Sequence, residues 1–284
     1  MTDVKLNILV AVQQEAEKRF REGLKKEPTF HVSLVTSLEK ARAAMDDATQ
    51  PIDVFVVDNT LGDVYDMLKE IRMKYPRLLI ISVDEGADFA LPGRADDIST
   101  EPFKNNDLIT RIKHLNEDRR LQTLRADALP PVRQFAKSIL RADQSGTSRQ
   151  QAAVEALAEL GYDYVAFYTI SKGDNPSLLL SAQVGPEEAT KLAPRQPDYN
   201  NSLLGWVAQN GQSRTVSPQD ELNHPFVKKG QFKSAACIPV GTTVRFGVMF
   251  ACRVDLDAIS QENVMMLELV SAQLASALAK EARS

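Results

Sequence analysis

The stretch "DVFVVDNTL", residues 53–61, decides how the first half of the chain folds. Its apolar residues 54–57 form an unbroken run, which is typical of a strand in a parallel sheet that helices cover on both faces. The run ends on the carboxylate of Asp58, and a polar loop follows at once. Two interpretations of Asp58 stay open at this point. It is either an N-cap that accepts backbone N–H bonds or a phosphate acceptor at the mouth of the sheet.

The sequence on either side of this strand repeats its pattern, because apolar runs alternate with segments of helical periodicity. The expected strands are residues 6–12, 30–35, 53–58, 77–84 and 95–100, and the expected helices lie within residues 13–27, 36–48, 64–75 and 105–115. Five strands connected in this way predict an α/β unit with a flavodoxin-like, doubly wound parallel sheet. Ligands of such sheets bind beyond the carboxyl ends of the strands, where Asp58 and Ser82 both lie.

The second half of the chain has a different pattern. Its expected elements are a helix at 148–161, two strands within 162–185, a short helix at 201–212, two strands within 234–254 and a long helix at 260–282. The strands are expected to turn at residues 173–176 and near Gly241, and Gly161 is a natural residue to follow a helix end. Hairpins between helices indicate an α+β domain with an antiparallel sheet.

Local signals place some boundaries. Thr36 with Glu39, and Ser260 with Asn263, have the spacing of helix-start caps. The pair Pro130-Pro131 is expected to end the helix that precedes it. The expected division is a first domain at 1–118, a helical linker at 119–134 and a second domain at 135–284.

Composition limits the function classes. The 284 residues carry a net charge of −4, which gives no electrostatic reason to expect binding to nucleic acid or to an anionic membrane. Cys237 and Cys252 form no CxxC motif, which excludes a zinc module and a disulfide framework and fits a reducing cytosol. No apolar run has the length of a membrane span, and the start "MTDVKLNILV" lacks the features of a signal peptide. We therefore expect a cytoplasmic protein.

The sequence carries no pattern of catalytic residues. His31, His114 and His224 are dispersed, which argues against a metal site or a catalytic pair. There is no Gly-rich phosphate loop and no supported Ser/His/Asp order. We expect no enzyme activity, no metal and no cofactor.

The segments "NILVAV", "DVFVVDNTL", "LIISV" and "ADDISTEPF" make residues 1–118 resemble the receiver domain of bacterial response regulators. The resemblance implies that Asp58 takes the place of the phospho-acceptor. It also implies that Ser82 takes the place of the Ser or Thr that senses the phosphoryl group.

Three departures from that family pattern imply a degenerate receiver, or pseudo-receiver. Family members hold Mg²⁺ with an acidic pair at the end of the first strand, where this chain has Val12 and Gln13. Glu101 stands where the family usually has Lys before Pro-Phe. Pro92-Gly93 falls where the fourth helix belongs, so that helix is expected to be short or missing. Asp58 is then expected to act mainly as a polar anchor for the loop.

The segments "LLGWVAQNGQSRTV", "SAACIPV" and "RFGVMFACRV" make residues 135–284 resemble a GAF domain. The resemblance implies a ligand cavity with Trp206, Arg214, His224 and Phe226 at its rim, although Trp206 by its spacing favours a core position. A basic rim for a small anion and a solvated loop both stay open. Cys237 has no neighbouring His, so covalent attachment of a bilin is not expected.

The last helix carries more apolar surface than one sheet face needs, because Met265 and Leu269 widen a stripe that includes Met266 and Leu274. Such a surface predicts pairing with a second chain in a homodimer.

The favoured function is that of a non-enzymatic cytosolic signalling protein of the two-component type. Its pseudo-receiver and GAF domain would act as an adaptor or scaffold through protein contacts and dimerisation. Three alternatives stay open. They are a GAF-based sensor of a nucleotide or metabolite, a response regulator controlled by phosphorylation of Asp58, and the sensory front of a longer enzyme.

Overall fold

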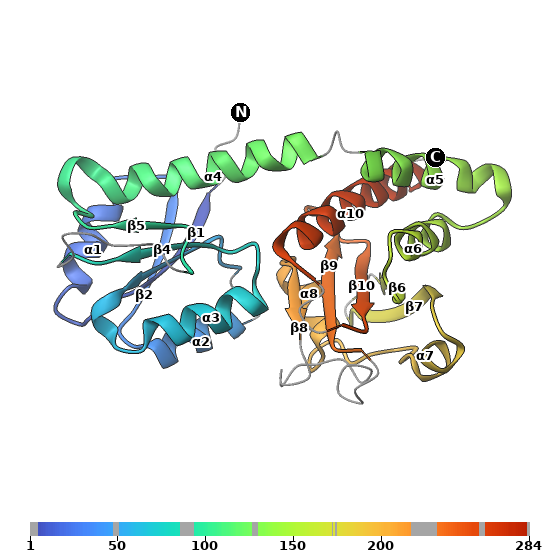
Figure 1. Cartoon of the computed structure of the whole chain (residues 1–284), viewed down its shortest axis with the longest axis horizontal. Coiled ribbons are helices and arrows are strands. Elements are labelled where there is room, and N and C mark those ends of the chain that lie inside the picture. The colour runs from blue at the N-terminus through green and yellow to red at the C-terminus, as the bar shows by residue number, and fades with distance from the viewer. Residues whose placement is uncertain are drawn as a thin grey trace. The chain divides into compact units, whose positions relative to one another are not determined.

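The computed structural model describes residues 5–47, 51–85, 94–126, 130–171, 173, 175–216, 232–255 and 259–282. The chain divides into two compact units, residues 1–73 with 78–122, and residues 74–77 with 123–284 (Figure 1). Each unit is described by itself.

The first unit is built on a five-stranded parallel sheet, which confirms the predicted α/β class. Its strands are β1 (Leu6–Ala11), β2 (Phe30–Val35), β3 (Val54–Asp58), β4 (Leu79–Val83) and β5 (Asp97–Ser99). The spatial order is β2-β1-β3-β4-β5, and every neighbouring pair is parallel. This is the doubly wound order with its reversal between β1 and β3.

Helices cover both faces of this sheet (Figure 1). They are α1 (Glu17–Leu24), α2 (Leu38–Asp46), α3 (Val64–Lys74) and α4 (Asp107–Ala126). Phe20 of α1 and Leu108 and Ile112 of α4 pack with Ile8 and Val10 on one face. The alternate strand residues are equally buried and face the side on which Figure 1 shows α2 and α3. The predicted cap at Thr36 is wrong by one residue, because Ser37 caps α2 through the backbone N–H of Lys40.

Arginine side chains hold the short strand β5 in place. Arg72 of α3 donates to Asp96 at 2.9 Å and to the carbonyl oxygen of Leu78, also at 2.9 Å. Arg111 of α4 donates to Asp97 at 2.8 Å. These contacts fix the sheet edge next to the segment where a helix was expected to be short or missing. Pro92-Gly93 of that segment lies outside the described residues.

The second unit contains a five-stranded antiparallel sheet, as predicted. Its strands are β6 (Tyr164–Ser171), β7 (Ser177–Val184), β8 (Arg214–Val216), β9 (Ser234–Val240) and β10 (Gly247–Arg253), in the order β7-β6-β10-β9-β8. Both predicted hairpins are present. Gly241 follows β9 with a φ of 99°, a left-handed conformation that glycine adopts at low cost.

Three helices pack on one face of that sheet (Figure 1). They are α5 (Pro130–Ser145), α6 (Arg149–Glu159) and α10 (Gln261–Glu281), whose buried residues share one core with the sheet. The shorter helices are α7 (Glu187–Leu192) and α8 (Leu203–Asn210). The cap at Ser260 is confirmed, because Ser260 and Asn263 form a reciprocal capping box.

The helix before Pro130-Pro131 ends at Ala126, as predicted, and Pro130 begins α5, since proline suits the first position of a helix. The expected linker 119–134 covers the last turns of α4 and the start of α5, and its limits stay a prediction. Within the described ranges, no helix is long and apolar enough to cross a membrane.

Candidate functional site

The carboxyl edge of the parallel sheet in the first unit gathers the residues that the sequence singled out. Asp58 ends β3 and is nearly buried, with 8% of its surface exposed. Its Oδ1 accepts hydrogen bonds from the backbone N–H of Thr60 at 2.9 Å and from the Thr60 hydroxyl at 2.7 Å. Asp58 is thus the N-cap of the short 3-10 helix η1 (Asn59–Leu61). One carboxylate oxygen is therefore held by the loop that follows the strand.

Gln13, just beyond the end of β1, contacts the same loop. Its side-chain amide donates to the carbonyl oxygen of Thr60 at 2.9 Å. Val12, the other residue at this place, is fully buried in the core of the first unit. A neutral amide therefore lies where the receiver resemblance implies metal-binding carboxylates, and it joins the ends of β1 and β3 directly.

Ser82 of β4 also takes part in a hydrogen-bond chain. Its hydroxyl donates to the side-chain oxygen of Asn59 at 2.6 Å. The amide nitrogen of Asn59 donates in turn to Asp84 Oδ2 at 3.1 Å. The Ser82 hydroxyl and the Asp84 carboxylate are thus linked through Asn59, and the loop after β3 is fixed from three strands.

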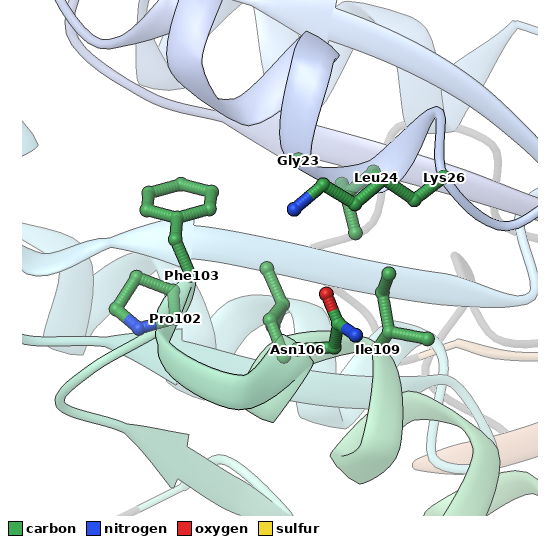
Figure 2. A pocket seen from close by; sticks show the side chains of 8 residues that line it. Gly23, Leu24, Lys26, Pro102, Phe103, Asn106 and Ile109 are labelled. Carbon is green, nitrogen blue, oxygen red and sulfur yellow. The ribbon is translucent and has the colours of Figure 1, made fainter.

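Glu101 does not take part in this edge. It is exposed and accepts from the Lys104 ammonium at 2.8 Å on the surface. Phe103, two residues further along the chain, packs edge-on against Phe20 with ring centroids 4.8 Å apart. Figure 2 shows Pro102 and Phe103 beside Gly23 and Leu24 of α1, where they line a small hollow at the start of α4. The Pro-Phe pair thus joins α1 to α4.

The polar groups of the described residues do not gather into a metal site, since no group of three or more His, Cys, Asp or Glu side chains is placed to hold an ion. His31 lies exposed on the edge strand β2, and His114 pairs with Asp118 on the surface of α4. His224 lies outside the described residues, as does Phe226.

A second candidate site is the face of the antiparallel sheet that α5, α6 and α10 do not cover. We call it the helix-free face, meaning free of those three helices, because the short helix α8 packs against β9 and β10 on this side. The strand residues that alternate with those of the shared core point to it, and they include Tyr164, Tyr168, Cys237, Phe250 and Cys252, all fully buried. Cross-strand register pairs Tyr164 of β6 with Cys252 of β10, Tyr168 with Val248, and Cys237 of β9 with Phe250 of β10.

The two tyrosine hydroxyls on the helix-free face, those of Tyr164 and Tyr168, differ in their hydrogen bonds. Tyr164 donates to the Gln183 side-chain oxygen at 2.9 Å. No hydrogen bond of ordinary geometry reaches the Tyr168 hydroxyl from the described residues, although Tyr164 lies near enough to influence its pKa. Burial raises the pKa of both hydroxyls and of the Cys252 thiol, so all three are neutral at physiological pH.

Two of the expected rim residues are buried. Trp206 of α8 is 5% exposed and Arg214 of β8 is 1% exposed, so a solvated rim does not describe either of them. The Arg214 guanidinium lies 5.1 Å from the centroid of the Trp206 ring, a cation–π distance. Arg214 pairs in register with Cys237, which places its side chain on the helix-free face.

The expected dimer helix is α10, and much of its apolar surface is covered within the chain. Leu274 is fully buried in the shared core, facing its own sheet. Leu269 is 6% exposed and packs with Val132 of α5, and Met265 and Met266 are partly buried against this pair. The four residues therefore do not form one free surface, because α5 lies over part of the stripe. Dimerisation itself stays a prediction.

Comparison with known proteins supports the assignment of the second unit. Residues 147–279 match a family model described as a GAF domain, which supports a GAF domain in this part of the chain. The search for curated relatives gave no match.

Similar solved structures include the GAF domain of an Acinetobacter phosphoenolpyruvate-protein phosphotransferase, with 18% identity over 53% of this chain and 94% of that one and a TM-score of 0.43. A type II free methionine-R-sulfoxide reductase from Thermoplasma acidophilum has 20% identity over 46% and 90% of the two chains, with a TM-score of 0.40. The GAF domain of a two-component sensor histidine kinase from Bacillus halodurans has 20% identity over 46% and 91%, with a TM-score of 0.39. At these identities the likeness concerns the fold alone.

Sequence reasoning missed several members of both sites. Asn59, Thr60 and Asp84 complete the carboxyl edge, and their polar types beside strand ends were the available signal. Tyr164 and Tyr168 were missed because their strand is apolar on both faces, which hides the alternation that separates one face from the other.

Proposed function

We propose that the chain is a non-enzymatic, cytoplasmic signalling protein whose receiver-like first unit and GAF domain act as an adaptor through protein contacts. A GAF domain fits a signalling or sensor role. The observation that carries the adaptor proposal is the carboxyl edge of the first unit. There Asp58, Gln13 and Ser82 are all engaged in hydrogen bonds to the loop after β3.

The physical reason is that phosphoryl transfer depends on charge neutralisation and positioning. Mg²⁺ binds through oxygen ligands, usually one or two carboxylates. At this edge Gln13 presents an amide donor to the Thr60 carbonyl, and Glu101 pairs with Lys104 away from Asp58. The side chains at the carboxyl edge of the sheet therefore bind the loop after β3 and do not favour binding of a metal ion and a phosphoryl group.

A magnesium titration tests this proposal. In two-dimensional amide NMR spectra, Mg²⁺ at millimolar concentration should leave the resonances of Asn59, Thr60 and Ser82 unshifted. Saturable shifts at these residues that disappear in Asp58→Ala would overturn the proposal.

A second candidate function is a small-molecule sensor, and the helix-free face favours it. Tyr168 has a fully buried hydroxyl without an ordinary hydrogen bond from the described residues, a costly arrangement unless another group completes it. Mass spectrometry of the intact protein under native and then denaturing conditions tests this function. A stoichiometric small molecule that is lost on denaturation would establish it in place of the pure adaptor.

Some proteins of this fold are named as free methionine-R-sulfoxide reductases, so thiol chemistry is a relevant contrast. Thiolate is the reactive form of cysteine, and burial raises the pKa of Cys252 and keeps it protonated. We therefore propose that this chain does not reduce methionine sulfoxide. Turnover of free methionine-R-sulfoxide with dithiothreitol that is lost in Cys252→Ser would contradict this.

We also propose a homodimer that uses the partly buried methionines of α10. Met265→Glu should halve the mass found by light scattering, because a carboxylate cannot be buried unpaired at low cost. Ala272→Glu, at an exposed position of the same helix, is the matched control and should leave the mass unchanged. A wild-type chain that stays monomeric at micromolar concentration would rule the homodimer out.

A further inference from the structure

Three cations lie on the outer face of α5, ahead of Asp143 in its last turn. Val132, Phe135, Ile139 and Ala142 turn inward and are buried. Arg133, Lys137 and Arg141 are exposed and follow one another at four-residue intervals, so they form one row along the helix, about 12 Å long. Leu140 lies on the same side. We call these four residues the basic face.

The cations of the basic face lack ion-pair partners among the described residues. Among the described residues, no carboxylate lies within salt-bridge distance of Arg133, Lys137 or Arg141. The sequence also has no acidic residue from Pro130 to Arg141. The helix α4 is different, because it carries paired charges such as Arg111 with Asp107. Three neighbouring cations in a chain of net charge −4 are thus left for an external anion.

An apolar side chain lies among these cations. Leu140 is 67% exposed, more than any other large hydrophobic side chain of the described residues. An exposed leucine bordered by charges of one sign suits a contact that combines apolar packing with ion pairs. A single exposed leucine is ordinary on a protein surface, so it is the position of Leu140 among three cations that bears on a contact.

We infer that the basic face docks an acidic, amphipathic helix of a partner protein. Carboxylates spaced four residues apart on that helix would face the row of cations, and an apolar residue between them would cover Leu140. This inference rests on the proposed adaptor function and adds the chemistry of the partner to it. Because exposed ion pairs each contribute little, the contact is weak and sensitive to salt.

Other occupants fit the basic face less well. A two-fold contact of α5 with its copy, centred on Lys137, would set Arg133 against the Arg141 of the second chain, which like-charge repulsion opposes. Three cations on an acidic chain release few counterions from nucleic acid. A helix lying in a membrane surface needs a broad apolar face, whereas this one offers Leu140 alone.

The test uses the full chain and a fluorescein-labelled synthetic helical peptide that has Glu at every fourth position and Leu between them. Fluorescence anisotropy should show saturable binding that weakens as salt is raised. A control peptide with Gln in place of Glu should bind about tenfold more weakly, as expected for three exposed ion pairs.

Variants of the chain locate the contact. The triple variant Arg133→Glu, Lys137→Glu and Arg141→Glu should lose about tenfold in affinity or more. The matched control Lys18→Glu, Lys25→Glu and Lys40→Glu changes the net charge equally, at exposed positions of the first unit, and should keep its affinity. The single variants Lys137→Glu and Leu140→Ala, which leave the inner face of α5 intact, should each weaken binding measurably.

Equal loss in both triple variants, or absence of peptide binding, would overturn the inference. So would tighter binding of a single-stranded oligonucleotide or of anionic vesicles to the same face. The magnesium titration is independent of these measurements. A failed peptide experiment with an unshifted carboxyl edge would therefore remove the docking face and leave the proposed function standing.

Discussion

The two candidate sites of this molecule differ in how they satisfy their polar groups. At the carboxyl edge of the first unit, Asp58, Gln13 and Ser82 bond to the loop beside them. On the helix-free face of the second unit, the Tyr168 hydroxyl is fully buried without an ordinary hydrogen bond from the described residues. The polar side chains of the carboxyl edge therefore bond to one another and to their own loop, whereas the Tyr168 hydroxyl is the group that could bond to a ligand.

The largest expected effect comes from disturbing α8 in the second unit. A Cβ on Gly205 would lie 2.0 Å from the carbonyl oxygen of Tyr199, which is backbone and cannot move aside easily. Gly205→Ala should therefore destabilise the second unit by about 1–3 kcal/mol. Denaturant unfolding followed by Trp206 fluorescence measures this change.

Gly23→Ala in the first unit is the matched control for that variant. Its Cβ would meet only the side chain of Phe103, which can shift, so the loss of stability should be smaller (Figure 2). A larger effect at Gly23 than at Gly205 would contradict this reading of the two close approaches.

The next effect compares the two sites directly. Asp58→Ala removes the acceptor for both Thr60 donors and should cost about 1 kcal/mol of stability, as the loss of an N-cap does. Asp58→Asn keeps a capping oxygen and should cost little. Chemical denaturation of the two variants checks this, and equal losses in both would show that the charge of Asp58 matters more than its cap.

Tyr168→Phe should change stability very little or raise it, because within the described part of the chain the hydroxyl that it removes has no hydrogen bond of ordinary geometry to lose. The same denaturation experiment applies. A loss of stability as large as that of Asp58→Ala would contradict this difference between the two sites, since it would mean that the Tyr168 hydroxyl already makes a good hydrogen bond.

The smallest expected effect is a pH dependence confined to the first unit. The hydrogen bond from Lys113, and then that from Thr29, lower the pKa of Glu27 below its ordinary value of 4.5. A carboxyl whose pKa is lowered in the folded state stabilises fully above its unfolded pKa, and this stabilisation is lost as the pH falls through the folded pKa.

Glu27→Gln should accordingly lower the melting temperature of the first unit slightly at pH 7. The difference from the unchanged protein should shrink below about pH 4, where the unfolded carboxyl also becomes protonated. Thermal melts at pH 7 and pH 3 check this. A difference that stays constant over this range would show that the charge of Glu27 does not contribute.

Much of the fold could be predicted from sequence because its signals are local. Apolar runs gave the strands, and Gly161 and Ser260 mark helix ends through their own backbone and side-chain chemistry. The cap of α2 was misplaced because Thr36 and Ser37 are adjacent and both can cap, so that only the backbone conformation decides between them.

The sites were harder to predict because their contacts join residues far apart in the sequence. The role of Asp58 depends on Thr60 beside it, and the role of Gln13 depends on a carbonyl 47 residues away. Arg214 was placed at the rim of a ligand cavity from the GAF resemblance alone, and the sequence did not show that its side chain lies buried over Trp206. The apolar stripe of α10 could be predicted from its periodicity, but periodicity does not tell which neighbour covers the excess, and Val132 of α5 packs on Leu269.

The central claim is that the carboxyl edge of the first unit no longer takes up a phosphoryl group. The most direct test is the intact mass of the chain after incubation with acetyl phosphate and Mg²⁺, with Asp58→Asn as the matched control. Both proteins should keep an unmodified mass. Stoichiometric addition of one phosphoryl group to the unchanged protein, absent in Asp58→Asn, would contradict it.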